Sequence, residues 1–248
     1  MTDRQRLDQR LVALKLADSR ARARDAILRG TVTVDGTVVE KPGALVSETC
    51  AIAIDDPAAG YVSRAALKLI AGLDAFGFDP AGLSCLDIGA STGGFTQVLL
   101  ERGARGVTAL DVGHGQLHDR LRADERVLAR EGLNARDLKA EDLPDPPEAI
   151  VSDVSFISLK LALGPALDLA APGAFGVFLI KPQFEVGREH IGKGGIVRDA
   201  GVAEASVAGV LDWIGARPGW RVVGTVASPI SGADGNRETV AGAIKDAA

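Results

Sequence analysis

Two hydrophobic spacings alternate along most of the chain. Short apolar runs are typical of strands, and apolar positions three and four residues apart are typical of helices. Beyond residue 60 the pattern predicts strands near 83–87, 106–112, 126–131, 148–153, 174–181, 221–228 and 239–245, with helices over 61–70, 95–102 and 202–215. Strands that alternate with helices predict an α/β fold with a mostly parallel, seven-stranded sheet and right-handed crossovers.

The first sixty residues follow a different pattern. Helical spacing predicts a helix over residues 4–16 and a second over 20–28, capped by Ser19. Two β-rich runs then flank Asp35-Gly36, a dipeptide typical of hairpin turns, and a further strand is predicted over 50–54. Two aspartates, a proline and small residues make 55–60 the best linker. We therefore expect a small α+β domain over residues 1–59 and a larger domain over 60–248.

Charge is distributed unevenly between these parts. The 248 residues carry a net charge of −5, so overall charge gives no sign of nucleic-acid binding. The segment from Arg4 to Arg29, however, holds eight basic residues against three acidic ones, a balance of +5. Arginines at helical spacing form a surface that can bind phosphates without reading sequence. The candidate RNA-binding residues of this segment are Arg4, Arg6, Arg20, Arg22 and Arg24.

Composition excludes several other classes of protein. The two cysteines, Cys50 and Cys85, have no zinc-type spacing and are expected to be reduced core thiols. No metal site is predicted. The chain has no run of about 20 apolar residues, so no membrane span is expected. We expect a cytoplasmic monomer.

A glycine-rich loop follows the first strand of the larger domain. The strand ends at Asp87, and glycines stand at positions 89, 93 and 94 before a helical pattern that starts at Phe95. Glycines let the backbone approach a ligand, and a helix start offers free N–H groups. The spacing differs from the G-x-G-x-x-G of dinucleotide binders. An acidic residue before the loop suits a ligand with an amino group and no phosphates, such as S-adenosylmethionine. The alternative is an ordinary turn rich in small residues.

Polar residues also end the later strands. Asp87, Asp111, Asp153 and Lys181 all fall at predicted carboxyl ends. Ligands of parallel α/β sheets bind at this edge, where an acid about 20 residues beyond the glycine loop binds ribose hydroxyls. The sequence therefore predicts a nucleoside-type site, with Asp111 as the ribose ligand.

The N-terminal segment resembles a known RNA-binding module. Two short helices with a basic face, followed by the Val32–Gly36 hairpin signal, are similar to the alpha-L motif first seen in a small-subunit ribosomal protein. The residues that carry this resemblance are Leu7, Asp8, Ser19, Arg20, Ala23, Ile27, Gly30, Val32, Val34, Asp35 and Gly36. The resemblance implies that residues 4 to 55 bind RNA.

The larger domain resembles the FtsJ-like ribose 2'-O-methyltransferases, and the whole chain resembles the TlyA family, often labelled hemolysins. The motifs that carry it are Tyr61-Val-Ser-Arg with Lys68-Leu69, Leu86-Asp-Ile-Gly-Ala-Ser-Thr-Gly-Gly-Phe, Ala109-Leu-Asp-Val-Gly, Ser152-Asp-Val-Ser-Phe-Ile-Ser, Ile180-Lys-Pro-Gln-Phe-Glu and Gly235-Asn-Arg-Glu. Many relatives have a glycine pair where this chain has Ala65-Ala66. The resemblance implies a Rossmann-like class I methyltransferase sheet, S-adenosylmethionine as cofactor, and cytidine 2'-O-methylation of 16S ribosomal RNA, 23S ribosomal RNA or both, within ribosomal subunits.

The same resemblance assigns site residues. It places a catalytic tetrad on Lys68, Asp153, Lys181 and Glu238. The cofactor-binding residues it implies are Asp87, Gly89, Ala90, Ser91, Gly93, Gly94, Phe95, Asp111 and, near the adenine, Asp137. A ribose hydroxyl must lose its proton as it attacks, and a lysine can act as base only when burial or a nearby cation lowers its pKa. Lys181 is expected to be the base or to activate the hydroxyl, and Lys68, Asp153 and Glu238 are expected to tune and position it.

A glycine-rich segment follows Lys181. Residues 184–199 hold several cations and are expected to contact RNA, with Arg188 and Lys193 as candidates together with Arg64 of the Tyr61 motif. Two other functions stay open. A membrane-lytic protein would fit the hemolysin label, although the sequence shows no membrane span and no long basic amphipathic helix with Trp or Phe on one face. A non-catalytic ribosome-assembly factor would not need the tetrad.

Overall fold

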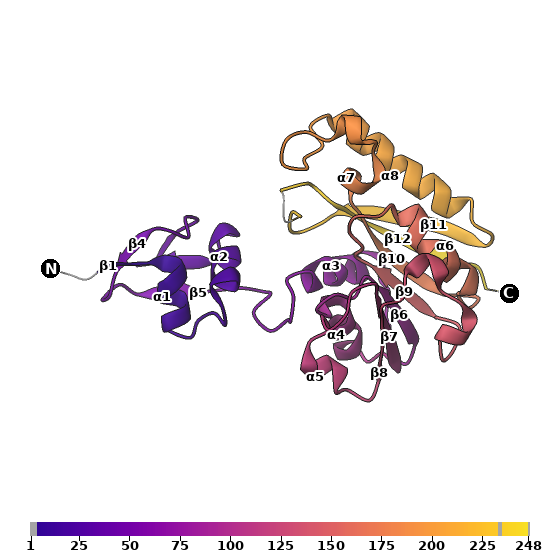
Figure 1. Cartoon of the computed structure of the whole chain (residues 1–248), viewed down its shortest axis with the longest axis horizontal. Helices are drawn as coiled ribbons and strands as arrows, with labels where there is room; N and C mark the ends of the chain where they lie inside the picture. The colour runs from indigo at the N-terminus through magenta and orange to yellow at the C-terminus, as the bar shows by residue number, and fades with distance from the viewer. Residues whose placement is uncertain (1–3, 233–234, 248) are drawn as a thin grey trace. The chain divides into compact units, whose positions relative to one another are not determined.

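The computed structural model describes residues 4–232 and 235–247, which divide into two compact units between Gly60 and Tyr61. The division lies one residue from the boundary expected from the sequence. Figure 1 labels helices and strands of both units where there is room.

The N-terminal unit builds a small core between two helices and two small sheets. Leu7 and Leu11 of α1 pack with Ala23 and Ile27 of α2 and with Val32 of β2, all of them buried. The hairpin turn at Asp35-Gly36 has positive φ at both residues, as the sequence predicted. The elements are β1 (Arg4–Arg6), α1 (Leu7–Ala13), α2 (Arg20–Leu28), β2 (Val32–Val34), β3 (Thr37–Val38), β4 (Leu45–Ser47) and β5 (Ile52–Ile54). The strands form a β3-β2-β5 sheet and a β1-β4 pair.

One prediction for this unit was wrong. Residues 4–6 are a strand that pairs antiparallel with β4, and the first helix starts only at Leu7. The leucine spacing continues past the true end at Ala13, but Lys15 has a φ of 58°, which breaks the helix. β4 was not predicted, because its three residues are too short to give an alternating signal.

The C-terminal unit contains the predicted seven-stranded sheet, in the order β11-β12-β10-β9-β6-β7-β8. Only β12 runs antiparallel to its neighbours; the other pairs within the sheet are parallel. The chain leaves β6 toward β7 on one side, and later returns to β9 on the other. Ligands bind at such a switch point, outside the carboxyl ends of the strands. The strands are β6 (Ser84–Ile88), β7 (Gly106–Asp111), β8 (Val127–Glu131), β9 (Ala149–Ser152), β10 (Phe175–Ile180), β11 (Trp220–Ala227) and β12 (Thr239–Lys245).

Helices cover both faces of this sheet (Figure 1). On one face, Leu69, Leu73 and Val98 of α3 and α4 pack against the strands. On the other face, Leu163 of α6 and Ile214 of α8 do the same. The helices are α3 (Ala66–Phe76), α4 (Gly94–Glu101), α5 (Asp119–Arg122), α6 (Leu159–Leu169), α7 (Pro182–Glu185) and α8 (Ala200–Gly215), with 3-10 turns η1 (Ala135–Asp137), η2 (Ala140–Asp142) and η3 (Arg188–His190).

Two helices differ from the sequence prediction. The helix expected over 61–70 starts later, at Ala66, and the preceding residues form turns in which the Ser63 hydroxyl accepts a hydrogen bond from the Ala65 N–H. α6 was not predicted, and it contains Pro165, which a helix tolerates poorly.

The structure tests two expectations from composition: that the cysteines are buried thiols and that no helix spans a membrane. Cys85 is buried, and burial raises the pKa of its thiol to about 12, so it is an inert core thiol. Cys50 is only partly buried, so the expectation of a core position holds for Cys85 alone. Among the described residues no helix is both long and apolar enough to cross a bilayer.

Candidate functional site

The glycine loop after β6 forms the base of the site. Gly89 has a φ of 82°, and a Cβ there would lie 3.0 Å from a side-chain carbon of Val154 and 3.2 Å from its Cα. Gly93 has a φ of 96°, and a Cβ there would clash with Leu121. Both positions therefore need glycine. The loop keeps its backbone close to the segment after β9, and it feeds directly into the start of α4.

Two adjoining cavities open at the carboxyl edge of the sheet. The larger has a volume of about 840 Å³ and is lined by the ends of β6 and β7, η1 and the segment before α6. The smaller has a volume of about 400 Å³ and is lined by the Ser63–Lys68 segment, the glycine loop and the residues after β9 and β10. Gly89, Ser91, Asp153, Ser155, Phe156 and Phe184 line both. A ligand in one cavity would therefore adjoin a ligand in the other.

The four predicted tetrad residues meet at the smaller cavity, which all four line. Lys68 lies on α3, Asp153 follows β9, Lys181 follows β10 and Glu238 precedes β12. The Lys181 Nζ lies 2.7 Å from Asp153 Oδ1, and the Lys68 Nζ lies 3.6 Å from Asp153 Oδ2 and 2.6 Å from Glu238 Oε2. Four segments distant in sequence thus supply one continuous chain of alternating charges.

Burial makes this pairing necessary. Lys68, Lys181 and Glu238 are buried, and the Asp153 side chain is 14% exposed. Unpaired charges in such a place would cost several kcal/mol each, whereas two ammonium and two carboxylate groups balance one another. Lys181 also donates a 2.7 Å hydrogen bond to the Ser155 hydroxyl. The lysine that we expect to act on the acceptor is therefore held in one orientation.

Asp111 and Ser91 shape the mouth of the larger cavity. The Asp111 carboxylate accepts hydrogen bonds from the N–H groups of Ser91 (2.8 Å) and Gly113 (2.7 Å). Ser91 itself has a φ of 48°, and its hydroxyl donates to Gln116. Each Asp111 oxygen keeps a further lone pair, so the carboxylate is oriented and can still accept hydrogen bonds from ribose hydroxyls.

Asp87 lies below the loop. Its side chain is fully buried, Thr96 donates a 2.7 Å hydrogen bond to Oδ2, and Oδ1 has no hydrogen-bond partner among the described residues. Burial raises the pKa of this carboxyl to about 7, against the lowering effect of the Thr96 hydroxyl, and the nearby Asp153 carboxylate raises it further. An unpaired acceptor in an apolar setting favours protonation or a cationic partner.

Two phenylalanines stand where the cavities join. Phe156 is 91% exposed with a φ of 66°, a strained conformation for a bulky residue. Its ring lies 5.2 Å from that of Phe184, and the Lys181 Nζ lies 6.0 Å from the Phe184 ring. The segment after β9 therefore presents an aromatic face beside the tetrad.

The structure brings most of the predicted cofactor residues together. Gly89 and Ser91 line both cavities, Asp111 lines the larger, and Ala90, Gly94 and Phe95 line the smaller. Asp87 and Gly93 are buried beneath the loop and line neither. Asp137 is exposed on η1 and also lines neither; its neighbours Asn134, Ala135 and Arg136 face the larger cavity instead. The sequence therefore indicated the right segment, but the geometry of the 3-10 turn η1 determines which of its residues face the larger cavity.

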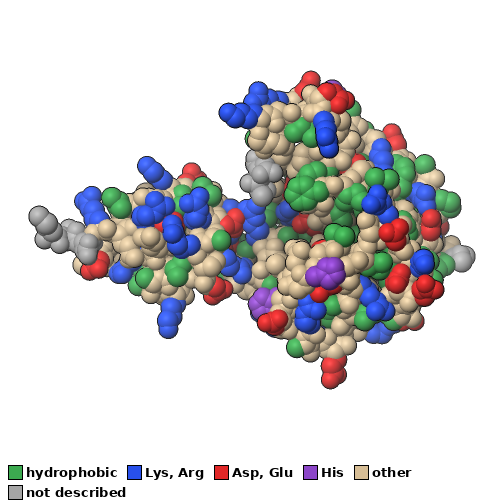
Figure 2. All heavy atoms as spheres, in the orientation of Figure 1, with side chains coloured by type: hydrophobic (Ala, Val, Ile, Leu, Met, Phe, Trp, Pro, Cys, Tyr) green, Lys and Arg blue, Asp and Glu red, His purple; other side chains and the backbone are tan. Residues whose placement is uncertain are grey.

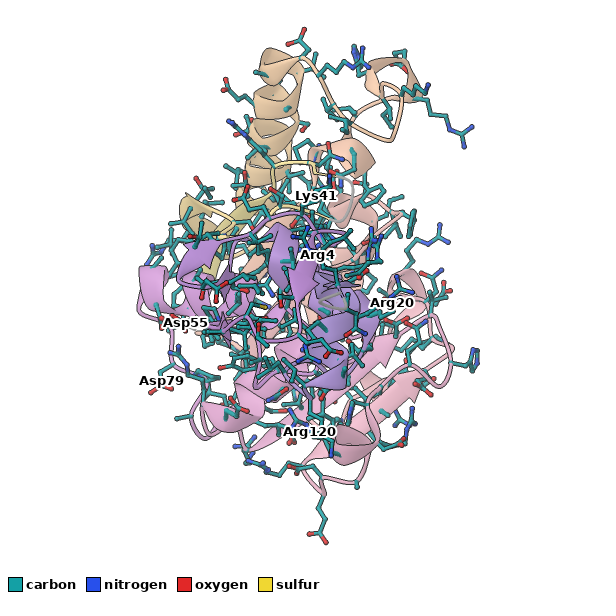
Figure 3. All side chains as sticks on the ribbon, turned by 90° about the vertical axis from the view of Figure 1, so that its left-hand side faces the viewer. Arg4, Arg20, Lys41, Asp55, Asp79 and Arg120 are labelled. Carbon is teal, nitrogen blue, oxygen red and sulfur yellow. The ribbon has the colours of Figure 1, made fainter. Side chains whose placement is uncertain are left out.

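The predicted RNA-binding residues of the N-terminal unit have different environments. Arg4 and Arg24 are exposed. Arg6 and Arg20 both pair with the buried carboxylate of Asp8, at 3.0 Å and 3.1 Å, and their hydrogen bonds hold the pKa of Asp8 down to about 2. Arg22 donates to the Ala58 carbonyl. Figure 3 labels Arg4, Arg20 and the exposed Lys41 on the side of this unit that faces the viewer.

In the C-terminal unit, Arg64 lines the smaller cavity, and Arg188 and Lys193 are exposed between α7 and α8. Sequence reasoning did not assign Ser155 or Arg136 to the site, although both line the larger cavity. Ser155 lies within the Ser152 motif, so the motif could have indicated its place beside Lys181. Arg136 is a single cation in a 3-10 turn, and no sequence pattern indicates its position.

Comparison with known proteins adds independent findings. Residues 61–245 match the family model of the FtsJ-like methyltransferases, and residues 5–49 match that of the S4 domain. A Mycobacterium tuberculosis protein named 16S/23S rRNA (cytidine-2'-O)-methyltransferase TlyA is 45% identical over 96% of this chain and 89% of its own. Hemolysin A of Brachyspira hyodysenteriae is 42% identical over 95% of this chain and 98% of its own. A solved structure from Streptococcus thermophilus, named as a candidate hemolysin, is 36% identical, with a TM-score of 0.74 over 99% of this chain and 90% of the other.

Proposed function

Because the chain belongs to the FtsJ-like methyltransferase family, we propose that it methylates a ribose 2'-hydroxyl of ribosomal RNA with S-adenosylmethionine as donor. The observation that carries this proposal is the convergence of Lys68, Asp153, Lys181 and Glu238 on a cavity that adjoins a nucleoside-sized one. We propose cytidine in 16S or 23S RNA as the target, on the basis of the M. tuberculosis relative's name.

The larger cavity fits this cofactor. Its volume lies within the range of small-molecule sites. Asp111 offers oriented acceptors for ribose hydroxyls, and apolar residues such as Leu110, Val112 and Leu133 provide walls for an adenine. Asp87 lies beneath the loop and lines neither cavity, so its carboxyl would act on the ammonium end only through its charge. When bound, S-adenosylmethionine supplies an electrophilic methyl group.

The tetrad then acts on the acceptor. The 2'-oxygen forms a bond to carbon as the bond from that carbon to sulfur breaks, and the hydroxyl proton must leave. Asp153 lines both cavities and pairs at 2.7 Å with Lys181, which lines the smaller one, and this pair receives the proton. Lys68 and Glu238, paired at 2.6 Å, keep the Asp153 carboxylate oriented and balance the charge.

A Lys181→Ala substitution tests the catalytic assignment. General acid–base groups contribute roughly 10²- to 10⁴-fold, so we expect methyl transfer to ribosomal subunits to fall by at least about 10²-fold. Cofactor affinity, measured by isothermal titration, should be retained, because Lys181 does not line the larger cavity. Lys139→Ala, which changes an exposed lysine, is the control. Turnover near the wild-type rate would remove Lys181 from this role.

The substrate and setting complete the proposal. The S4 match and the exposed arginines of the N-terminal unit support ribosomal RNA as partner. We propose residues 1–59 as the RNA-binding domain and 60–248 as the methyltransferase domain. We also propose a monomer in the cytoplasm, where ribosomal RNA, its proposed partner, is found.

Two alternatives have direct tests. A membrane-lytic activity, which the name of the B. hyodysenteriae relative suggests, predicts leakage from liposomes exposed to the pure protein. A non-catalytic assembly factor predicts no binding of S-adenosylmethionine in a calorimeter, even with RNA present. We expect cofactor binding and no leakage. Mapping of ribose methyls on ribosomal RNA, with and without the gene, identifies the nucleotide.

A further inference from the structure

A small basic hairpin stands between α7 and α8. Ile191 and Val197 form an antiparallel bridge, and the Gly192 N–H donates to the Ile196 carbonyl at 2.9 Å. We call residues 188–198 the basic hairpin, because Arg188, Lys193 and Arg198 outnumber Glu189, three against one, with His190 neutral. All three cations are exposed. In Figure 1 this segment lies beside the loop that leads into β12, and blue side chains project from this region in Figure 2.

One buried asparagine holds this hairpin. Asn236 is 4% exposed, and both the oxygen and the nitrogen of its side-chain amide form hydrogen bonds with the hairpin backbone. Its Oδ1 accepts from the Val197 N–H at 3.2 Å, and its Nδ2 donates to the Gly195 carbonyl at 2.9 Å. Two hydrogen bonds from one side chain to a short segment fix both the position and the orientation of that segment. Without them the hairpin would be flexible, because it contains three glycines.

The same asparagine belongs to the segment that carries the last tetrad residue. Its carbonyl accepts from the Gly232 N–H at 3.0 Å, and Glu238 follows two residues later. Gly232 and Glu238 line the smaller cavity, where Glu238 pairs with Lys68. Asn236 therefore joins the basic hairpin directly to a wall of the acceptor cavity.

We propose that Asn236 is a positioning residue that holds the basic hairpin as a phosphate-binding surface for the RNA beside the acceptor cavity. The inference rests on the proposed function for the identity of the ligand. Cations strengthen RNA binding where they contact phosphates. In a flexible arm, part of that binding free energy would be offset by the conformational entropy lost when the arm becomes ordered. Asn236 removes the flexibility before the RNA arrives. Its side-chain hydrogen bonds go to the hairpin backbone and it does not line the larger cavity, so we expect its effect to be on RNA binding.

A double-mutant cycle on the intact chain tests this inference. The variants are Lys193→Gln with Arg198→Gln, then Asn236→Ala, then all three together. The probes are purified 30S and 50S ribosomal subunits from a strain that lacks this gene. Dissociation constants are measured for both over a range of salt concentrations. We expect the charge variant and Asn236→Ala each to weaken binding to one of these subunits by roughly ten-fold, with a shallower dependence on salt.

Non-additivity is the deciding result. If Asn236 acts through the hairpin cations, the combined variant should bind within about two-fold of the charge variant. Losses that multiply, or wild-type affinity in Asn236→Ala, would overturn the proposal. Arg105→Gln with Arg221→Gln, at the amino ends of β7 and β11, is the charge-matched control, and the cofactor dissociation constant checks that each variant is folded. Because binding is the readout, the cycle decides the inference even if the wild type transfers no methyl group, a result that would defeat only the proposed function.

Discussion

At the scale of single residues, the buried Asp87 makes a prediction about pH. Its pKa is raised from 3.8 to about 7 by burial, so the folded protein without cofactor binds this proton across a range where the unfolded chain has released it. The unfolding free energy should therefore fall as pH rises from about 4 to about 7, with a slope of up to roughly 1.4 kcal/mol per pH unit from this group.

Asp87→Asn isolates that contribution. The amide keeps the shape of the carboxyl but cannot titrate, so the variant should lose this component of the slope. Urea unfolding followed by tryptophan fluorescence measures it, because Trp213 and Trp220, the two tryptophans of the chain, both belong to the C-terminal unit. Parallel pH curves for the two proteins would show that Asp87 titrates normally.

How far the site could be predicted varies by residue. The strand-end positions of Asp111, Asp153 and Lys181 follow from periodicity, since parallel strands bring their carboxyl ends to one edge. Lys68 sits within a helix among apolar residues, and only the family motif distinguished it from a solvated lysine. Asp137 could not be placed, because the geometry of a single 3-10 turn decides which side chain faces the cavity.

At the scale of elements, the strands were easier to predict than the segments that join them. Strands β6, β7, β9 and β10 have buried runs of four to six residues, whereas α6 contains a proline and β4 has three residues. The cavity walls are formed largely by these joining segments, which are harder to predict from sequence. The segment from Asp153 to Ser158 has no regular structure, yet it lines both cavities. Its position depends on long-range contacts that no local pattern encodes.

Glu185 makes the clearest of those contacts. Its carboxylate, at the end of α7, accepts from the Ser158 hydroxyl at 2.6 Å and from the Leu159 N–H at 2.7 Å, so it ties the segment after Lys181 to the start of α6. Glu185→Ala should lower the unfolding free energy by about 1–3 kcal/mol, since the buried N–H loses its partner. Misplacement of the catalytic segment should also cut methyl transfer by roughly ten-fold or more.

Calorimetry and turnover measure these two effects. Glu185→Gln, which keeps one acceptor oxygen, should fall between the wild type and Glu185→Ala in both. Glu204→Ala, at an exposed position on α8, serves as the matched control. A Glu185→Ala protein with full stability and full turnover would show that the segment is held by its other contacts.

At the scale of the whole molecule, we propose that the N-terminal unit supplies affinity for RNA and the C-terminal unit supplies the chemistry. Arg4 and Arg24 are exposed, and neither pairs with an acidic residue in the part of the chain that the structure describes. Phosphate contacts set the salt dependence of RNA binding. Replacing both arginines by glutamine in the full chain should weaken binding to ribosomal subunits and reduce the slope of log K against log salt by about 1.4–1.8, or roughly 0.7–0.9 for each lost contact.

If the N-terminal unit supplies only affinity for RNA, the cofactor affinity and kcat of the double variant should stay unchanged. The double variant should keep the wild-type cofactor affinity and, at saturating subunits, the wild-type kcat, because the tetrad and both cavities belong entirely to the C-terminal unit. Removing the same amount of charge with Arg105→Gln and Arg221→Gln should leave the dependence of binding on salt unchanged, because these arginines lie at the amino ends of β7 and β11, at the edge opposite the site. A fall in kcat for the Arg4 and Arg24 variant, with no change in KM, would mean that the N-terminal unit takes part in the chemical step and does not only recruit the RNA.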